Sequence, residues 1–303
     1  GRGPISAKLV TPRINGPQFD TRDLTAPDLV IGESLDAWIG IRIINAANIP
    51  ATNLAIEIES QDGITTRTPV AMIVPLGIFK APARIQSGPF GLEGPARFRV
   101  ALVRADSPDG DAKGMLDETT IELTVKSSTA TRKETFQSKI EGSAQYFAVV
   151  PAAKPTIKSE ARPGIVLSLH GASVEALGQA QCYAPRDWAF IIAPTNRRPY
   201  GFDWEDWGRI DALEVLDTAR KRFRTDPLRQ WLTGHSMGGH GTWQIGAQNN
   251  DIFAAIAPSA GWISFFTYVK APTAAIDAND FVGKILDRSA NPSRTLLLKD
   301  NYL

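Results

Sequence analysis

A serine flanked by glycines is the clearest sign of chemistry in this chain. Residues 234–238 read G-H-S-M-G, with Ser236 at the centre. The apolar run 231–233 predicts a strand before this motif, and residues 238–248 are expected to form a helix after it. Between a strand and a helix, a G-x-S-x-G turn raises the serine hydroxyl above the sheet, where it can attack a carbonyl carbon. An ordinary strand-to-helix turn is the alternative, but the flanking elements and the additional Gly239 favour nucleophilic catalysis.

A nucleophilic serine needs a histidine that takes its proton and a carboxylate that orients that histidine. The chain has three histidines, at positions 170, 235 and 240. His235 stands in the turn beside the serine and His240 within the following helix, so both are poorly placed as bases. His170 is expected to be structural, with its ring bonded to the backbone. The sequence therefore predicts a nucleophile without its base.

The carboxylates that follow the serine give no better partner. Asp300 would end a strand if residues 295–300 were extended, but Pro292 after Asn291 and the leucine-rich composition favour a helix there. The other candidates fall in predicted loops or helix starts: Asp251, Asp277, Asp280 and Asp287. We therefore expect the acid and the histidine on a segment that follows Leu303, and we expect residues 1–303 alone to be almost inactive.

From residue 128 to 303 the pattern alternates between strands and helices. A hairpin is expected over 135–150, and an apolar stripe at positions 210, 213, 216, 219 and 223 predicts one long amphipathic helix. Further strands are expected at 165–169, 189–192 and 253–257, with a helix over 174–184. This alternation predicts an α/β fold with a mostly parallel sheet, incomplete at its C-terminal side, and helices on both faces. Ligands bind such sheets at the carboxyl ends of the strands, where Ser236 lies.

Residues 1–127 have a different pattern, with period-two apolar runs between turn residues. The runs fall at 37–44, 54–58, 96–103 and 119–125. Such short strands predict a separate antiparallel β-sandwich. The stretch 39–59 is similar to bacterial immunoglobulin-like adhesion modules. No residue in this part suggests chemistry.

Composition excludes several classes of protein. The net charge of +1 over 303 residues gives no electrostatic footprint for nucleic acid. No apolar run reaches the roughly 18 residues that a membrane span needs. Cys182 is the only cysteine, so no disulfide forms within the chain. Neither a metal nor an organic cofactor is expected, and we expect a secreted or periplasmic protein.

Three segments together carry a family resemblance. They are H-G at 170–171, D-W-E-D-W-G-R-I-D-A-L at 203–213 and G-H-S-M-G-G-H-G-T-W at 234–243. With them, residues 130–303 resemble prolyl-oligopeptidase-type α/β-hydrolases. More narrowly, they are similar to bacterial secreted peptidases or esterases that carry a β-rich N-terminal domain. The resemblance implies Ser236 as the nucleophile and a later strand and loop that bear the acid and the histidine.

The resemblance also implies an oxyanion hole. Its donors would be the backbone N–H of Met237 and one near Gly171 or Ala172. Aromatic residues follow two of the predicted strands and could line an apolar substrate pocket, with packing between loops and sheet as the alternative. The candidates are Tyr200, Trp204, Trp207 and Trp262.

Three functions agree with these features. The first is a serine hydrolase that acts on a small ester or peptide, with its acid and histidine on a missing C-terminal segment. The second is a catalytically silent relative that binds a surface or a partner. The third is a hydrolase completed by a C-terminal fragment of the same protein as a separate chain. The predicted sandwich lacks the size filter of oligopeptidases, which favours esters over peptides.

Overall fold

The structure is a computed structural model. It describes residues 12–13, 16–108, 113–153, 162–197, 203–263, 280–289 and 294–302. The chain divides into two compact units. One extends to Lys126 and includes Thr135–Gln145; the other comprises Ser127–Glu134 and the chain from Tyr146 onward. The predicted boundary at 127/128 stays a prediction. The structure assigns residues 135–145, which follow that boundary, to the first unit.

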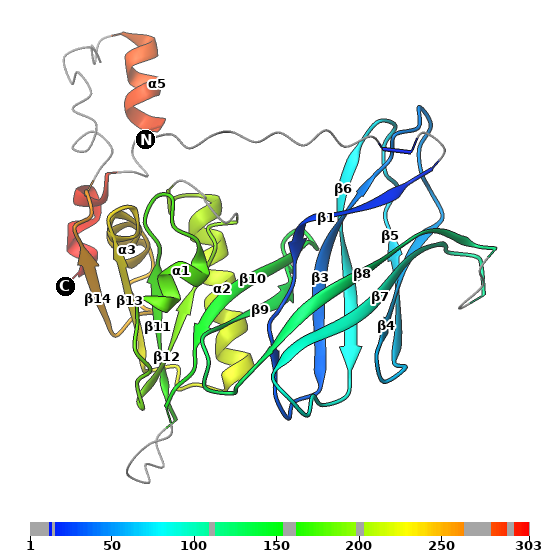
Figure 1. Ribbon diagram of the computed structural model, residues 1–303. Helices are drawn as coiled ribbons and strands as arrows, with labels where there is room; N and C mark the ends of the chain where they lie inside the picture. Colours follow the sequence, from blue (N-terminus) through cyan, green and yellow to red (C-terminus); the bar gives the residue numbers. More distant parts are fainter. Residues whose placement is uncertain are drawn as a thin grey trace, which may run out of the picture. The chain divides into compact units, whose positions relative to one another are not determined.

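The first unit contains two β-sheets, drawn in blue to green in Figure 1. One has the order β1-β3-β6 and the other β2-β8-β7-β4-β5. All pairs are antiparallel except β2 with β8. The strands are β1 (Gln18–Thr25), β2 (Leu29–Val30), β3 (Leu35–Ile44), β4 (Leu54–Ser60), β5 (Thr65–Val70), β6 (Ile78–Ser87), β7 (Gly94–Arg104) and β8 (Met115–Lys126). The four strands expected from the sequence are therefore present.

One hydrophobic core joins these two sheets. Alternate residues of β3, such as Ile39 and Ile41, are completely buried, as are Val100 and Leu102 of β7. All four belong to the same cluster of packed side chains. The period-two pattern thus places one face of each sheet in the core. An immunoglobulin-like topology for this unit stays a prediction.

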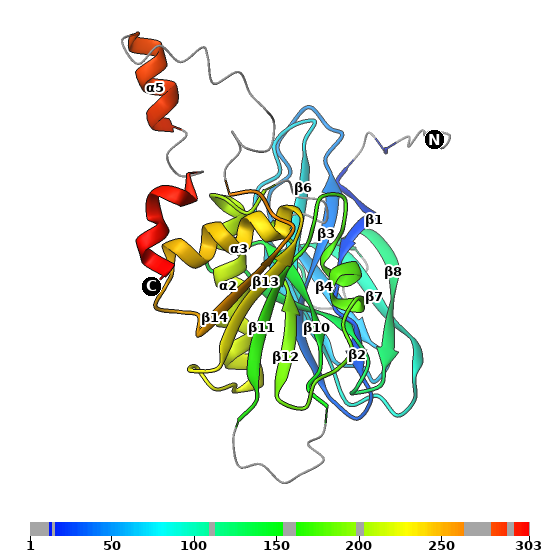
Figure 2. The ribbon, with the colours of Figure 1, turned by 90° about the vertical axis from the view of Figure 1, so that its left-hand side faces the viewer.

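The second unit contains most of a six-stranded sheet of order β14-β13-β11-β12-β10-β9 (Figure 2). Strands β9 and β10 of this sheet also include residues that are assigned to the first unit. β14, β13, β11 and β12 are parallel, whereas β10 pairs with β12 antiparallel, so the sheet is mixed. The elements are β9 (Arg132–Gln137), β10 (Ala144–Val150), β11 (Gly164–Leu169), α1 (Ala176–Gln181), β12 (Ala189–Ala193), α2 (Trp207–Phe223), β13 (Gln230–His235), α3 (Met237–Gln248), β14 (Ala255–Ser259) and α5 (Phe281–Ser289). A 3₁₀ helix spans Thr295–Tyr302.

Helices cover both faces of this sheet. On one face, Val166 and Ile191 pack with Ala176 and Ala180 of α1. Phe190, the neighbour of Ile191 in β12, points to the opposite face because side chains alternate along a strand. There its ring stacks on Phe223 of α2, with 4.6 Å between the centroids. None of the helices that the structure describes is long and apolar enough to cross a membrane.

Candidate active site

Ser236 is the single residue between the end of β13 and the first residue of α3. Its backbone has φ 56° and ψ −117°, outside the regions that a residue with a Cβ normally occupies. A conformation of this kind costs about 1–3 kcal/mol and persists only where the surrounding structure holds it. The N–H of Ser236 donates to the carbonyl of Ser259 at 2.9 Å, and its carbonyl accepts the N–H of His240 at 3.1 Å. The turn is therefore fixed on both sides of the serine.

The glycines around the serine allow the backbone segments to approach one another. A Cβ on Gly234 would lie 2.3 Å from the carbonyl oxygen of Gly238. A Cβ on Gly238 would lie 2.0 Å from the oxygen of Leu169, and one on Gly239 2.4 Å from that of Ser259. Real Cβ atoms do not come so close, so these positions of the G-x-S-x-G-G run require glycine.

The sheet register brings the C-terminal ends of β11, β13 and β14 to the same end of the sheet. Leu169 of β11 is the partner of Gly234, and His235 of β13 is the partner of Ser259 at the end of β14. Because these strands are parallel, the segments that follow them emerge together. A Cβ added to Gly171, just after β11, would lie 3.7 Å from the Cβ of Ser236. The backbone at Gly171 therefore runs beside the elbow.

Met237, the residue after the serine, opens α3 and is completely buried. Its sulfur accepts the backbone N–H of Asp203 at 2.9 Å. The loop between β12 and α2 is thus tied to the residue predicted to supply an oxyanion donor. The N-terminus of a helix favours negative charge, because its first N–H groups have no partners within the helix.

His170 is structural, as the sequence analysis expects. The residue is completely buried. One ring nitrogen lies 2.9 Å from the carbonyl oxygen of Gly171, and the other lies 3.3 Å from that of Thr195. Burial lowers the pKa of His170 below its ordinary value, which favours a neutral ring with a single N–H to donate.

The two other histidine rings are also engaged away from the serine. Nδ1 of His235 lies 3.2 Å from the hydroxyl of Ser259. His240, completely buried, donates from Nδ1 to the carbonyl of Trp262 at 3.0 Å, while its Nε2 lies 2.9 Å from Glu205. Among the residues that the structure describes, no histidine ring is hydrogen-bonded to the hydroxyl of Ser236.

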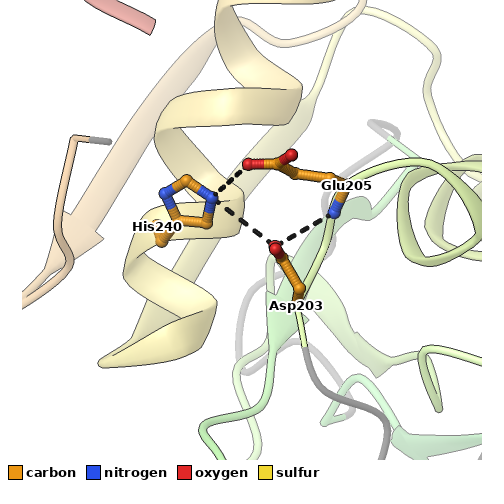
Figure 3. Close-up of side chains that lie close together, drawn as sticks. All are labelled: Asp203, Glu205 and His240. Atoms are coloured by element: carbon orange, nitrogen blue, oxygen red, sulfur yellow. Dashed lines mark hydrogen bonds and ion pairs between the residues drawn. The ribbon is translucent and has the colours of Figure 1, made fainter. Parts of the chain in front are cut away.

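Asp203, Glu205 and His240 form a compact cluster between the loop before α2 and helix α3 (Figure 3). Nε2 of His240 lies 2.9 Å from the Glu205 carboxylate and 3.5 Å from that of Asp203. Burial and the neighbouring charge of Glu205 raise the pKa of Asp203, whereas His240 lowers it. The three side chains are of types that could hold a divalent cation. The three side chains already contact one another within the protein, so we assign the cluster a structural role.

The predicted aromatic pocket is only partly supported. Trp204 is completely buried, and its indole N–H donates to the carbonyl of His170 at 3.0 Å. Its assignment to the pocket is therefore corrected: Trp204 packs beneath the elbow and has no surface for a substrate. Trp207 is 49% exposed, with the guanidinium of Arg197 above its ring. Trp262 is half-buried and stacks on His240, and Tyr200 lies outside the described residues.

The segment 295–302 is helical, which confirms that Asp300 does not end a strand. Among the other acids considered, Asp277 and the side chain of Asp287 lie outside the described part, and Asp280 precedes α5. Asp251 is exposed in the turn after α3. None of the described acids after the serine contacts a histidine ring.

A buried charge network near the site was not predicted. Asp211 on α2 is completely buried. It accepts the backbone N–H of Arg197 at 3.2 Å, and the Arg197 side chain lies 3.6 Å from it and 3.0 Å from Glu214. Burial raises the pKa of Asp211 to about 6 despite the nearby guanidinium. No local pattern in the sequence signals this network, because Asp211 lies outside the predicted apolar stripe.

Several known proteins are similar to parts of this chain. Solved structures include FphF, a fluorophosphonate-binding serine hydrolase of Staphylococcus aureus, with 20% identity, a TM-score of 0.37 and coverage of 45% of this chain and 58% of that chain. S-formylglutathione hydrolase FrmB of Staphylococcus aureus gives 18% identity, a TM-score of 0.41 and coverage of 57% and 73%. A thermostable esterase gives 15% identity, a TM-score of 0.35 and coverage of 85% and 81%.

The chain thus spans less than two thirds of the length of FphF. No curated protein matches it. The family model "Esterase" matches residues 160–293, which include the elbow, the loop after β11 and the cluster of Figure 3. The matched residues all lie in the second unit.

Proposed function

We propose that this protein is a serine esterase that forms an acyl-enzyme at Ser236. The observation that carries the proposal is the backbone of Ser236, held at φ 56° and ψ −117° between β13 and α3. A similar backbone occurs at Asp206 before α2, but at Ser236 it belongs to a G-x-S-x-G turn and presents a hydroxyl group. In the proposed reaction the hydroxyl oxygen attacks the ester carbonyl carbon, and its proton passes to a base. The alcohol then leaves with a proton from that base, and water releases the acid in the second half-reaction.

The developing oxyanion would be held by two backbone donors. The N–H of Met237, at the start of α3, is one, and an N–H at Gly171 or Ala172 is the other. The proximity of Gly171 to Ser236 and the buried side chain of Met237 support this assignment. Donors fixed in this way need no reorganisation as charge develops, and each contributes roughly 3 kcal/mol to transition-state stabilisation.

The proposed base is a histidine other than the three in this sequence. His170, His235 and His240 each have ring contacts that keep them away from Ser236. A continuation of the chain or a C-terminal fragment acting as a separate chain would supply the base and its acid. Residues 1–303 alone would then react at Ser236 only slowly.

Further parts of the proposal concern the substrate and the first unit. Trp207 and Trp262, near the strand ends, would contact an apolar part of a small ester. A prolyl-oligopeptidase-type ancestry would leave peptide bonds as the alternative substrate. The first unit would be an immunoglobulin-like sandwich in a secreted or periplasmic protein, without a cofactor.

Chemical rescue tests this proposal. The hydrolysis of an aryl acetate is measured for residues 1–303 and for Ser236→Ala, with and without added imidazole, and the variant's rate is subtracted. We expect a small rate that depends on Ser236 and rises with imidazole, because imidazole replaces the absent base. If hydrolysis that depends on Ser236 were equally fast with and without imidazole, the result would contradict the proposal that the base lies outside residues 1–303. Equal rates for both proteins under every condition would exclude Ser236 as the nucleophile.

A further inference from the structure

A second candidate site lies at the end of the same sheet where the parallel strands begin, opposite the end that carries Ser236. A cleft of about 610 Å³ is lined by residues before β11, at the end of α2 and before β13, among them Arg162, Asp217, Arg220, Lys221, Arg224 and Thr225. These residues come before the parallel strands, whereas Ser236 follows one of them. Since a six-residue strand is roughly 20 Å long, the cleft is separate from the elbow.

The cleft carries an excess of positive charge. Lys221 is paired with Asp217 at 2.5 Å, one turn apart on α2. Among the described residues, the side chains of Arg162, Arg220 and Arg224 have no hydrogen bond or ion pair. Three guanidinium groups thus line the cleft without an ion pair among the described residues, since Asp217, which also lines it, is paired with Lys221.

Arg222 shows the contrast on the same helix. It does not line the cleft, and its guanidinium is paired with Glu134 at 3.1 Å. The helix macrodipole explains cations in the last turn of α2, such as Arg220 and Lys221. It does not explain Arg162, which comes from the segment before β11. Arg224 is the C-cap residue of α2, with a left-handed φ of 48°.

Thr225 is an independent sign of a ligand. The residue is only 6% exposed and lines the cleft, and its hydroxyl has no hydrogen-bond partner among the described residues. A buried hydroxyl without a partner costs about 1–3 kcal/mol. An oxygen-rich anion in the cleft offers an acceptor for this donor.

We propose that this cleft binds a small molecule that carries two linked phosphate groups. Guanidinium groups bind phosphate oxygens in bidentate fashion, and three of them match more than one phosphate. The volume lies within the roughly 300–1,000 Å³ of small-molecule sites. The phosphates would lie between Arg162, Arg220 and Arg224, with one oxygen toward Thr225.

Isothermal titration calorimetry with inorganic pyrophosphate tests the site. We expect saturable binding to residues 1–303, weaker binding of orthophosphate, and affinity that falls as salt is raised. Arg220→Gln and Arg224→Gln should each weaken binding about tenfold, since each loses a charge-assisted bidentate contact. The matched control, Arg222→Gln, removes the same charge from the neighbouring position and should leave the affinity unchanged. Equal losses in all three variants would overturn the proposal, because they would indicate only a response to net charge. Absence of binding would overturn it as well.

Thr225→Val separates a ligand contact from a structural role. The isosteric change removes an unpartnered hydroxyl, so the midpoint of thermal unfolding should stay the same or rise. Pyrophosphate affinity should nevertheless fall several-fold. Unchanged affinity would exclude the hydroxyl from the site. An oligonucleotide that binds through the same arginines more tightly than pyrophosphate would replace the proposed small molecule with a nucleic acid.

Discussion

The indole N–H of Trp204 donates to the carbonyl of His170 at 3.0 Å, and their rings meet edge to face at 4.9 Å. This contact joins the loop before α2 to the loop after β11, directly under the elbow. Gly241 of α3 completes the arrangement, because its backbone lies against the indole: a Cβ there would be 2.5 Å from Cβ and Cγ of Trp204. The packing beneath Ser236 thus depends on the indole of Trp204 and on the absence of a side chain at Gly241.

Gly241→Ala should therefore lower the free energy of unfolding of the second unit by about 2 kcal/mol, a typical cost of overpacking. Gly178→Ala on α1 is the control: its Cβ would meet only Val174, at 3.5 Å. That variant should be neutral or more stable by about 0.5–1 kcal/mol, because alanine favours a helix more than glycine does. Tryptophan fluorescence in a urea titration measures both, since every tryptophan except Trp38 belongs to the second unit. Equal stability of the two variants would contradict the packing argument.

The contact between Glu205 and His240 should contribute more than a surface ion pair. Both partners are largely buried, with 18% and 0% of the side chains exposed, and the bond is 2.9 Å long. Glu205→Gln should destabilise the unit by about 1–3 kcal/mol, because it weakens a charge-assisted bond to a buried ring. Asp217→Asn removes the exposed partner of Lys221 and should cost less than about 1 kcal/mol. Thermal unfolding of the two variants side by side measures the difference, and a smaller effect at Glu205 would contradict the structural role of the cluster.

Asp211 should make stability depend on pH. Its pKa is raised to about 6 in the folded protein, so between about pH 4 and pH 6 the folded state binds more protons than the unfolded state. The free energy of unfolding should therefore fall, by about 3 kcal/mol, as pH rises through this window. Asp211→Asn should abolish this part of the pH dependence, with Arg197 and Glu214 still facing the position. If ion pairing with Arg197 instead lowered the pKa of Asp211, the free energy of unfolding would rise with pH, which would contradict this prediction.

Local patterns predicted much of the second unit. The elbow serine, the glycines around it and the strands at its edge follow from residue types at short range, and the helix over 295–302 followed from proline and leucine content. The buried face of α2 was only partly predicted. The expected stripe included Ile210 and Leu213, which are half-buried, whereas Asp211 and Val215 are completely buried.

The remaining features depend on contacts between distant segments. Glu205 and His240 are 35 positions apart, so nothing in either local sequence indicates that they meet. Trp204 has the character of both a pocket residue and a core residue, and only the path of its loop decides between them. Asp211 on α2 is buried beside Arg197, a partner that comes from another loop.

The most direct test of the account is covalent labelling of Ser236. The protein is treated with a fluorophosphonate, with and without imidazole, and the modified peptide is identified by mass spectrometry. Ser236→Ala is compared with Ser259→Ala, which removes another hydroxyl at the same strand ends. We predict a single adduct at Ser236 that forms faster with imidazole, is retained in Ser259→Ala and is absent from Ser236→Ala. No adduct at Ser236, or equal labelling of both variants, would contradict the claim that the strained turn presents a nucleophile.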